Sequence, residues 1–153
     1  MSIVQKNSNY HADNTMAIII GTNQDDNLIG TSENDIITPK LGNDFVDGGA
    51  GTDTLVLDFS SLDSVSGNFD AAASGSGFYN GSGAGGKFSN IHFTNIERLN
   101  ITGSKGNDFF RGGTLNDVLR GGAGNDMLMA KQGTTPFMAE LETMCSMGGL
   151  ATT

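Results

Sequence analysis

The feature that most limits how this chain can fold is a nine-residue repeat. Two clean copies are GGAGTDTLV (48–56) and GGAGNDMLM (121–129), and weaker copies begin at residues 21, 30, 39, 103 and 112. Every copy has Asp at its sixth place and an apolar residue at its eighth. The sixth-place residues are Asp26, Asp35, Asp44, Asp53, Asp108, Asp117 and Asp126, and the eighth-place residues are Leu28, Ile37, Val46, Leu55, Phe110, Leu119 and Leu128.

The composition of each repeat predicts a turn followed by a short strand. The first six places are rich in Gly, Asn and Asp, which tolerate positive φ and hydrogen-bond their own backbone. The last three places are too few for a helix but suffice for a strand whose middle side chain points to one side. Such a strand cannot bury its apolar side chain alone, so the copies must stack and cover one another. The repeats therefore predict an all-β fold.

Stacking would also align the sixth-place carboxylates in rows along the edge of the stack. Neighbouring carboxylates repel each other, and a divalent cation between them relieves that repulsion. A ligand set made only of carboxylate and carbonyl oxygens prefers a hard cation of flexible geometry. The rows therefore predict binding sites for Ca²⁺ in preference to Mg²⁺.

The pattern GGxGxDxUx resembles the calcium-binding repeat of RTX (haemolysin-type) proteins, and residues 21–56 and 103–129 carry the resemblance. The stretch 93–108 is also similar to the re-entry into a repeat block in cyanobacterial-type RTX proteins. The resemblance implies a right-handed parallel β-roll (a β-solenoid) with two facing sheets. It also implies calcium ions between turns two repeats apart, which pairs Asp26 with Asp44, Asp35 with Asp53, and Asp108 with Asp126. The turn glycines that would supply backbone ligands are Gly48, Gly49, Gly51, Gly103, Gly106, Gly112, Gly121, Gly122 and Gly124.

Departures from the family pattern predict sites of unequal quality. Gln24, Glu33 and Leu115 replace the fourth-place glycine, and Pro39-Lys40 replaces the opening Gly-Gly. A side chain where positive φ is required costs about 1 kcal/mol or more. We therefore expect the sites at Asp53 and Asp126 to form best and those at Asp26 and Asp117 to be weakest. Asp117 would also need a partner at the position of Thr135.

The repeat pattern divides the chain into five segments. These are a loose leader (1–17), a first roll block (18–56), a Gly/Ser-rich insert (57–102), a second roll block (103–129) and a tail (130–153). We expect the insert to pack on or extend the roll through longer strands joined by a mobile loop at 74–86. If the blocks stack continuously, Asp44 with Asp108 and Asp53 with Asp117 would form further sites. The tail would contain a short helix, either capping the roll or resembling an export signal.

An apolar row at the seventh place is the second unusual feature. These residues should face outward, where a bare roll would carry polar side chains, and such a row marks a covered face or a partner surface. We favour cover by the insert over a protein or surface partner. The row is Ile36, Phe45, Phe109, Val118 and Met127.

Composition argues against several classes of function. The net charge of −9 disfavours nucleic acid or an anionic membrane as a partner. The sequence has no apolar run long enough to form an integral membrane segment, and no Sec-type signal is expected. It lacks the HExxH, GxSxG and P-loop motifs, so we expect no enzyme activity.

The leading hypothesis is a calcium-binding module of a secreted RTX-type protein, which folds on binding calcium outside the cell. The resemblance implies export by a type I system and an extracellular or cell-surface location. One alternative is a surface adhesin or matrix interaction protein that uses the apolar row. Another is a non-catalytic fragment of a larger RTX toxin or enzyme.

Overall fold

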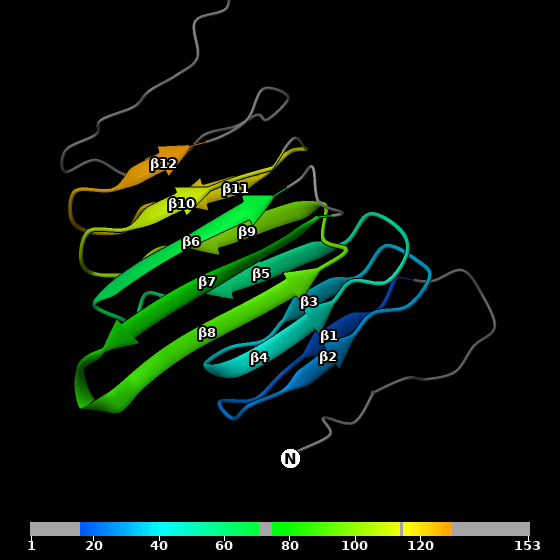
Figure 1. Cartoon of the computed structure of the whole chain (residues 1–153), viewed down its shortest axis with the longest axis horizontal. Coiled ribbons are helices and arrows are strands. Elements are labelled where there is room, and N and C mark those ends of the chain that lie inside the picture. Colours follow the sequence, from blue (N-terminus) through cyan, green and yellow to red (C-terminus); the bar gives the residue numbers. More distant parts are fainter. Residues whose placement is uncertain (1–15, 71–74, 114, 130–153) are drawn as a thin grey trace, which may run out of the picture.

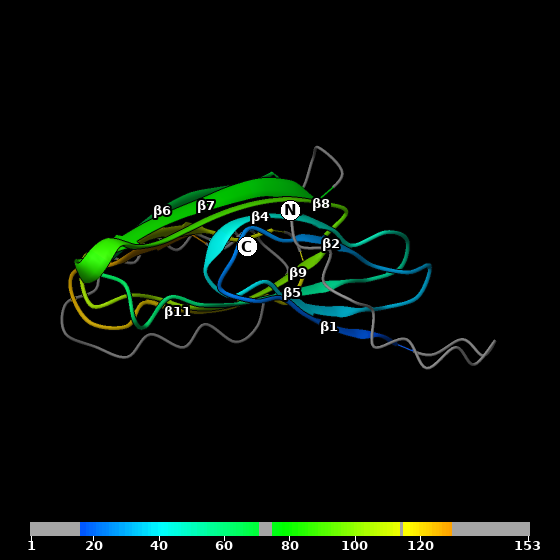
Figure 2. The ribbon, with the colours of Figure 1, turned by 90° about the horizontal axis from the view of Figure 1, so that it is seen from below.

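Two β-sheets face each other across a single apolar core (Figures 1 and 2). The computed structural model describes residues 16–70, 75–113 and 115–129. Within them, strands account for the regular structure apart from one 3-10 turn, Ala84–Gly86. The strands are β1 (Ile18–Ile20), β2 (Asn27–Ile29), β3 (Ile36–Thr38), β4 (Gly42–Asp47), β5 (Thr54–Asp58), β6 (Ser64–Asp70), β7 (Ser76–Gly83), β8 (Lys87–Thr94), β9 (Arg98–Thr102), β10 (Phe109–Arg111), β11 (Val118–Arg120) and β12 (Met127–Met129). The prediction of an all-β fold is confirmed.

Successive repeat strands alternate between the two sheets. The five-stranded sheet has the order β1-β3-β5-β9-β11, and all of its neighbours are parallel. The seven-stranded sheet has the order β12-β10-β6-β7-β8-β4-β2. Because each repeat crosses to the other sheet, in-register neighbours lie two repeats apart, as with Ile37 beside Leu55. In six of the seven repeats the turn ends immediately before the strand, whereas in the repeat at 39–47 the strand β4 already begins at Gly42.

The eighth-place side chains fill the space between the sheets. Six of them are at most 2 % exposed, and Leu128 at the end of the described stack is 8 % exposed. Burying a side chain of this size contributes about 1.5–3 kcal/mol. The middle residue of each three-residue strand therefore holds the two sheets together.

An aromatic cluster extends this core where the insert meets the second block. The rings of Tyr79 and Phe93 stack with centroids 5.9 Å apart, and Phe110 meets Tyr79 edge-on at 5.9 Å. Phe59 lies 6.3 Å from both Tyr79 and Phe110. The Tyr79 hydroxyl donates a hydrogen bond to the carbonyl of Arg111 at 2.9 Å. The insert thus shares one core with the repeats.

The Gly/Ser-rich segment 74–86, which we expected to be a mobile loop, instead contains the whole of β7. This strand pairs antiparallel with β6 and β8 (Figure 1). Close packing requires glycine at one position in each of β6 and β7: a Cβ on Gly81 of β7 would lie 2.6 Å from Leu62 Cδ1, and one on Gly67 of β6 would overlap the Tyr79 ring. Glycine in a strand often marks such a close approach.

The insert also changes the register between the two blocks. Three insert strands, β8, β7 and β6, separate β4 from β10, whereas β9 alone separates β5 from β11. On β9 the register shifts, because Leu99 is opposite Leu55 of β5 while Ile101 is opposite Leu119 of β11. The shift of two residues keeps the same side chains facing inward.

The sites expected from continuous stacking are therefore not formed. Asp44 lies opposite Ile91 of β8, and Asp108 accepts a hydrogen bond from Val65 of β6. The Asp117 carboxylate accepts from the Leu99 N–H, two residues beyond Glu97, instead of meeting Asp53. The condition for pairing Asp44 with Asp108 and Asp53 with Asp117 is not met, because strands of the insert lie between the two blocks in both sheets.

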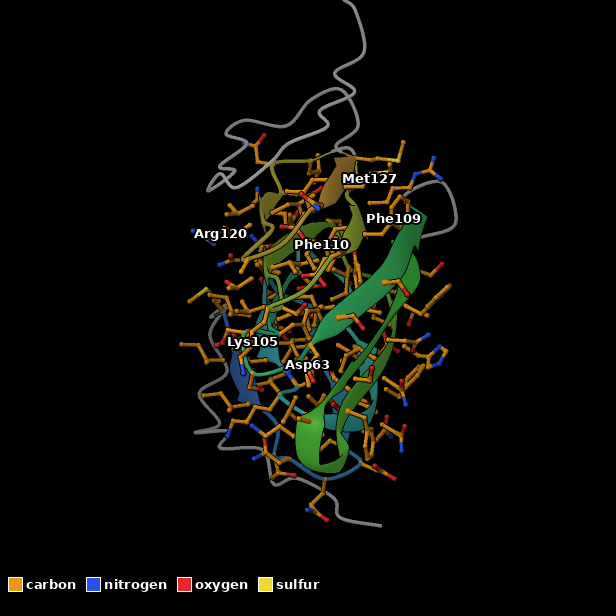
Figure 3. All side chains as sticks on the ribbon, turned by 90° about the vertical axis from the view of Figure 1, so that its left-hand side faces the viewer. Asp63, Lys105, Phe109, Phe110, Arg120 and Met127 are labelled. Atoms are coloured by element: carbon orange, nitrogen blue, oxygen red, sulfur yellow. The ribbon has the colours of Figure 1, made fainter. Side chains whose placement is uncertain are left out.

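The apolar seventh-place row is not covered by the insert. The insert strands join the seven-stranded sheet edge to edge, in the plane of β4 and β10, instead of lying over its outer face. Phe45, Phe109 and Met127 are 44 %, 36 % and 43 % exposed, whereas Ile36 and Val118 on the other sheet are partly buried. Phe109 and Met127 lie on neighbouring strands (Figure 3).

Two expectations fall outside the described residues. These are the leader up to residue 15 and the C-terminal helix in 130–153. Where the chain is described, no helix is long and apolar enough to cross a membrane.

Candidate metal centre

The sixth-place aspartates form two rows, one at each edge of the stacked strands. The first Asp row lies at the N-terminal ends of repeat strands in the five-stranded sheet and holds Asp35, Asp53 and Asp117. The second lies at the N-terminal ends of repeat strands in the seven-stranded sheet and holds Asp26, Asp44, Asp108 and Asp126. All but Asp126 are at most 4 % exposed. Burying carboxylates is costly unless they are hydrogen-bonded, paired or bound to a metal. The partners of these carboxylates therefore determine what the rows can bind.

In each predicted pair, the backbone N–H of one Asp donates to Oδ1 of the other, and this bond joins the two turns. The Asp26 N–H donates to Asp44 Oδ1 at 2.9 Å, and the Asp35 N–H donates to Asp53 Oδ1 at 2.7 Å. In the second block the Asp108 N–H donates to an Asp126 oxygen at 2.9 Å. The structure thus brings together all three pairs predicted from the resemblance.

In four of the repeats the turn closes onto its own carboxylate. The second-place N–H, from Thr22, Thr31, Ser104 or Gly113, donates to Oδ2 of the sixth-place Asp at 2.5–2.6 Å. The hydroxyls of Thr22, Thr31 and Ser104 donate to the same carboxylates. We call these closed turns; they are the turns that lead to Asp26, Asp35, Asp108 and Asp117.

The other three repeats have open turns, in which the second and fourth places adopt positive φ. These places are Lys40 and Gly42, Gly49 and Gly51, and Gly122 and Gly124, with φ between 75° and 133°. Lys40 carries the strain that a Cβ suffers in this conformation. Open turns lead to Asp44, Asp53 and Asp126, so each predicted pair joins one closed turn to one open turn.

The strain expected at Gln24, Glu33 and Leu115 is absent. These residues lie in closed turns, and among the described non-glycine residues only Lys40 and Asn95 have positive φ. The family pattern suggested that every fourth place needs glycine, but a closed turn does not need it.

The absence of a side chain on the first-place glycines allows a carboxylate oxygen of the same turn and a carbonyl oxygen of the partner turn to lie close together. At Gly21, Gly30 and Gly103 an added Cβ would lie 2.6–2.9 Å from the Oδ2 atom of the Asp in the same turn. The same Cβ would overlap or closely approach the first-place carbonyl oxygen of the partner turn, which belongs to Pro39, Gly48 or Gly121 respectively. We call this space a cradle. Each predicted pair has one, and it is lined by oxygen atoms, as a hard cation requires.

The remaining predicted glycines shape the same turns. Gly49 donates its N–H to Asp47 Oδ1 at 3.0 Å, Gly106 donates to Ser104 Oγ at 3.2 Å, and Gly112 places Asp117 Oδ2 2.7 Å from where its own Cβ would be. A Cβ on Gly122 or Gly124 would press on the turn at residues 103–107. Whether their carbonyls bind a metal stays a prediction.

Among the described residues, two buried carboxylate oxygens have no hydrogen-bond partner, and both belong to open turns. They are Oδ2 of Asp44 and Oδ2 of Asp53. Burial, reinforced by Asp26 and Asp25, raises the pKa of Asp44 to about 7. Burial, reinforced by Glu97, Asp35 and Asp47, raises the pKa of Asp53 to about 6. Both carboxylates therefore need a proton or a cation.

Burial also raises the pKa of Asp108 and of Asp117. Among the described residues, no three His, Cys, Asp or Glu side chains gather as a metal-binding cluster. The carboxylates come instead in pairs, and backbone carbonyls supply the other nearby oxygens. This donor set suits calcium, which accepts carbonyl and water ligands alongside carboxylates.

Sequence reasoning missed the second-place hydroxyls and Glu97. Thr or Ser follows the first-place glycine at residues 22, 31 and 104, and this recurrence was the available signal for closed turns. Glu97 lies beside Asp53 in register, because Thr54 pairs with Arg98. The sequence could have revealed Glu97, because it precedes the buried Leu99 by two residues, just as Asp53 precedes the buried Leu55.

In a calcium chelator, raising the pH from 5.5 to 8 should unfold the protein. The folded-state pKa values of Asp44 and Asp53 lie above the unfolded value of 3.8, so folding takes up protons. The stability they contribute is full below pH 3.8 and is lost as the pH rises through about 6 to 7. Each carboxyl contributes on the order of 1–4 kcal/mol. Far-UV circular dichroism measures the folded fraction.

Asp44→Asn is the control for this pH effect. The neutral amide can still accept from the Asp26 N–H, so the part of the pH dependence near pH 7 should be lost while the part due to Asp53, near pH 6, remains. A folded fraction that rises with pH in chelator would contradict the expectation.

A family model described as RTX calcium-binding nonapeptide repeat (4 copies) matches residues 20–55 and 101–134. The two ranges include all seven sixth-place aspartates. No curated protein matches the chain at a significant level.

Proposed function

This chain carries RTX calcium-binding nonapeptide repeats, and from that premise we propose that it is the calcium-binding module of a secreted RTX-type protein, which folds when it binds calcium outside the cell. The repeats bind Ca²⁺, and the repeat family is a non-catalytic calcium-binding domain. RTX repeat proteins are typically secreted by type I systems, which supports an extracellular location.

Each ion would lie between a closed turn and an open turn of one row. Its ligands would be the two sixth-place carboxylates of a pair, a first-place carbonyl at the cradle, and water. The pairs are Asp26 with Asp44, Asp35 with Asp53, and Asp108 with Asp126. The observation that carries this proposal is the pair of buried, unpartnered oxygens on Asp44 and Asp53, because a carboxylate oxygen without a donor needs a cation or a proton.

The winding of the repeats would be that of a right-handed parallel β-roll. Alternation of repeat strands between two sheets and the parallel pairing of strands two repeats apart support it. The strands β6, β7 and β8, of which β7 runs antiparallel to the other two, interrupt the roll without breaking its core. Asp117, which accepts from Leu99 and faces no second repeat carboxylate in the described residues, would contribute least to binding.

Calcium binding would drive folding because the neighbouring carboxylates of each Asp row repel one another when no calcium is bound. Buried carboxylates at neighbouring turns disfavour the folded state, so the binding free energy becomes folding free energy. Extracellular modules bind calcium at about 0.1–1 mM, far above cytosolic levels. The chain would thus stay unfolded inside the cell and fold after export.

A calcium titration followed by far-UV circular dichroism tests the proposal, with magnesium as the control. We expect a cooperative gain of β signal at about 0.1–1 mM calcium and none at the same magnesium concentration, because magnesium demands a stricter geometry and gives up water reluctantly. A full β signal in chelator at pH 8, unchanged by calcium, would overturn calcium-coupled folding.

A second candidate function is a surface adhesin or matrix interaction protein. The observation that favours it is the exposure of Phe45, Phe109 and Met127 on the outer face of the seven-stranded sheet. The same face carries Phe78 and Phe88, which are 41 % and 43 % exposed. Apolar side chains gathered on one face mark a partner surface more often than isolated ones do. A module within a larger RTX toxin or enzyme is compatible with either function.

A further inference from the structure

A fourth cradle lies where the insert returns to the repeats, outside the nonapeptide pattern. An added Cβ on Gly48 would lie 2.7 Å from Asp53 Oδ2 and would overlap the carbonyl oxygen of Asn95. The three repeat cradles have the same two oxygens, one from the Asp of the same turn and one from the partner turn. Here the partner turn is the short segment before β9, and Asn95 takes a left-handed conformation with φ 53°.

Glu97 occupies the position that the partner Asp has in the repeat pairs. The Asp53 N–H donates to Glu97 Oε2 at 2.8 Å, just as the Asp35 N–H donates to Asp53 Oδ1. The register agrees, since Thr54 and Leu55 pair with Arg98 and Leu99. The same backbone-to-carboxylate contact therefore recurs with a sequence separation of 44 residues instead of 18.

The carboxylate at this cradle lacks the partner that the repeat cradles provide. In the closed turns, Oδ2 of Asp26, Asp35 and Asp108 accepts the second-place N–H. Asp53 is fully buried and belongs to an open turn, where the Gly49 N–H donates to Asp47 instead. Its Oδ2 has no hydrogen-bond partner, and it lies at the cradle beside the Asn95 carbonyl.

The surrounding backbone is fixed by the insert and by β5. Gly48 donates its N–H to the carbonyl of Thr94 at 3.0 Å, and Arg98 donates to the carbonyl of Asp53 at 3.0 Å. The Asn95 side chain donates to Asp47 Oδ1 at 2.8 Å. These bonds hold the Asn95 carbonyl and the Glu97 carboxylate against the turn at 48–53.

We propose that Asp53, Glu97 and the carbonyl of Asn95 form a calcium site at the junction of the insert and the first block. It would be a site additional to the three repeat pairs, with water completing the six to eight oxygens that calcium takes. The proposal rests on the proposed function, because it requires that the repeats bind calcium. An ion here would tie together two segments separated by the whole insert.

Counting bound ions by native mass spectrometry tests the site. Glu97→Gln keeps an acceptor for the Asp53 N–H and removes the charge, so we expect it to bind one calcium ion fewer than wild type at a given calcium concentration. Glu33→Gln is the matched control, since Glu33 lies on a turn of the same edge but not at a cradle, and it should bind as many ions as wild type. Equal counts for wild type and Glu97→Gln would overturn the junction site.

The two proposals fail differently in this experiment. A wild-type chain that binds no calcium contradicts the proposed function, whereas a calcium-loaded wild type with unchanged Glu97→Gln contradicts only the junction site. Crystals of the wild-type chain grown in calcium give a check that does not depend on the variant folding. Anomalous scattering should locate an ion between Asp53 and Glu97, and ions at the repeat pairs with none there would overturn the proposal.

Discussion

Replacing Asp53 with alanine should remove more calcium-dependent stability than any other single change in the two Asp rows. One of its oxygens accepts from the Asp35 N–H, and the other lies at the cradle beside Asn95. The Asp53 side chain therefore contacts two neighbouring turns, the one that leads to Asp35 and the one at Asn95. A site filled at 100 times its Kd contributes about 2.7 kcal/mol, so loss of one or two sites should cost about 3–5 kcal/mol.

The measurement is the free energy of unfolding in saturating calcium minus that in chelator, for wild type and variant. Asp117→Ala is the control, because Asp117 is equally buried yet meets the backbone of Leu99 where a second carboxylate would be needed. Asp126→Ala should also exceed Asp117→Ala, since Asp126 pairs with Asp108. Equal calcium-dependent losses for Asp53→Ala and Asp117→Ala would show that neighbouring carboxylates do not decide site strength.

Phe110→Ala should lower the free energy of unfolding in saturating calcium by about 3–5 kcal/mol. Phe110 is fully buried and contacts the rings of Phe59 and Tyr79, which belong to the insert. The truncation removes this contact between the insert and the second block and leaves a cavity that the surrounding strands cannot fully close.

Phe109→Ala is the matched control for this truncation. Phe109 is the preceding residue of the same strand, but it points to the opposite face and is 36 % exposed (Figure 3). Its replacement should cost less than about 1 kcal/mol. Chemical denaturation of both variants in calcium gives the comparison. Similar losses at the two positions would mean that the insert is not packed on the second block.

The repeats could be predicted from sequence because their rules are local. A period of nine, with Asp at the sixth place and an apolar residue at the eighth, defines both what is buried and which turns meet, as Ile37 and the pair Asp35–Asp53 illustrate. Three of the four closed turns were also readable in principle, from Thr or Ser at the second place, whereas the turn at Gly113 carries no such signal. We overlooked that signal because the family pattern treats both kinds of turn as imperfect copies of one turn.

The insert could not be predicted because its contacts are not periodic. Segment 74–86 has the composition of a flexible linker, and only the close approach of Leu62 to Gly81 explains why glycine suits a strand there. Glu97 joins the first Asp row only because the segment before it forms a shortened turn. The two-residue shift on β9 likewise depends on which strands pair, and composition does not determine that.

The unequal number of strands between the two blocks affects the electrostatic interaction between their bound ions. On the second Asp row, four strand-to-strand steps separate Asp44 from Asp108, or roughly 19 Å at about 4.8 Å per step. That exceeds the screening length of about 8 Å in physiological salt. The electrostatic interaction between ions bound to the first block and ions bound to the second is therefore largely screened at this edge. At the opposite edge Asp53, Glu97 and Asp117 precede the adjacent strands β5, β9 and β11, so electrostatic coupling between the blocks is expected to be stronger on that side of the molecule.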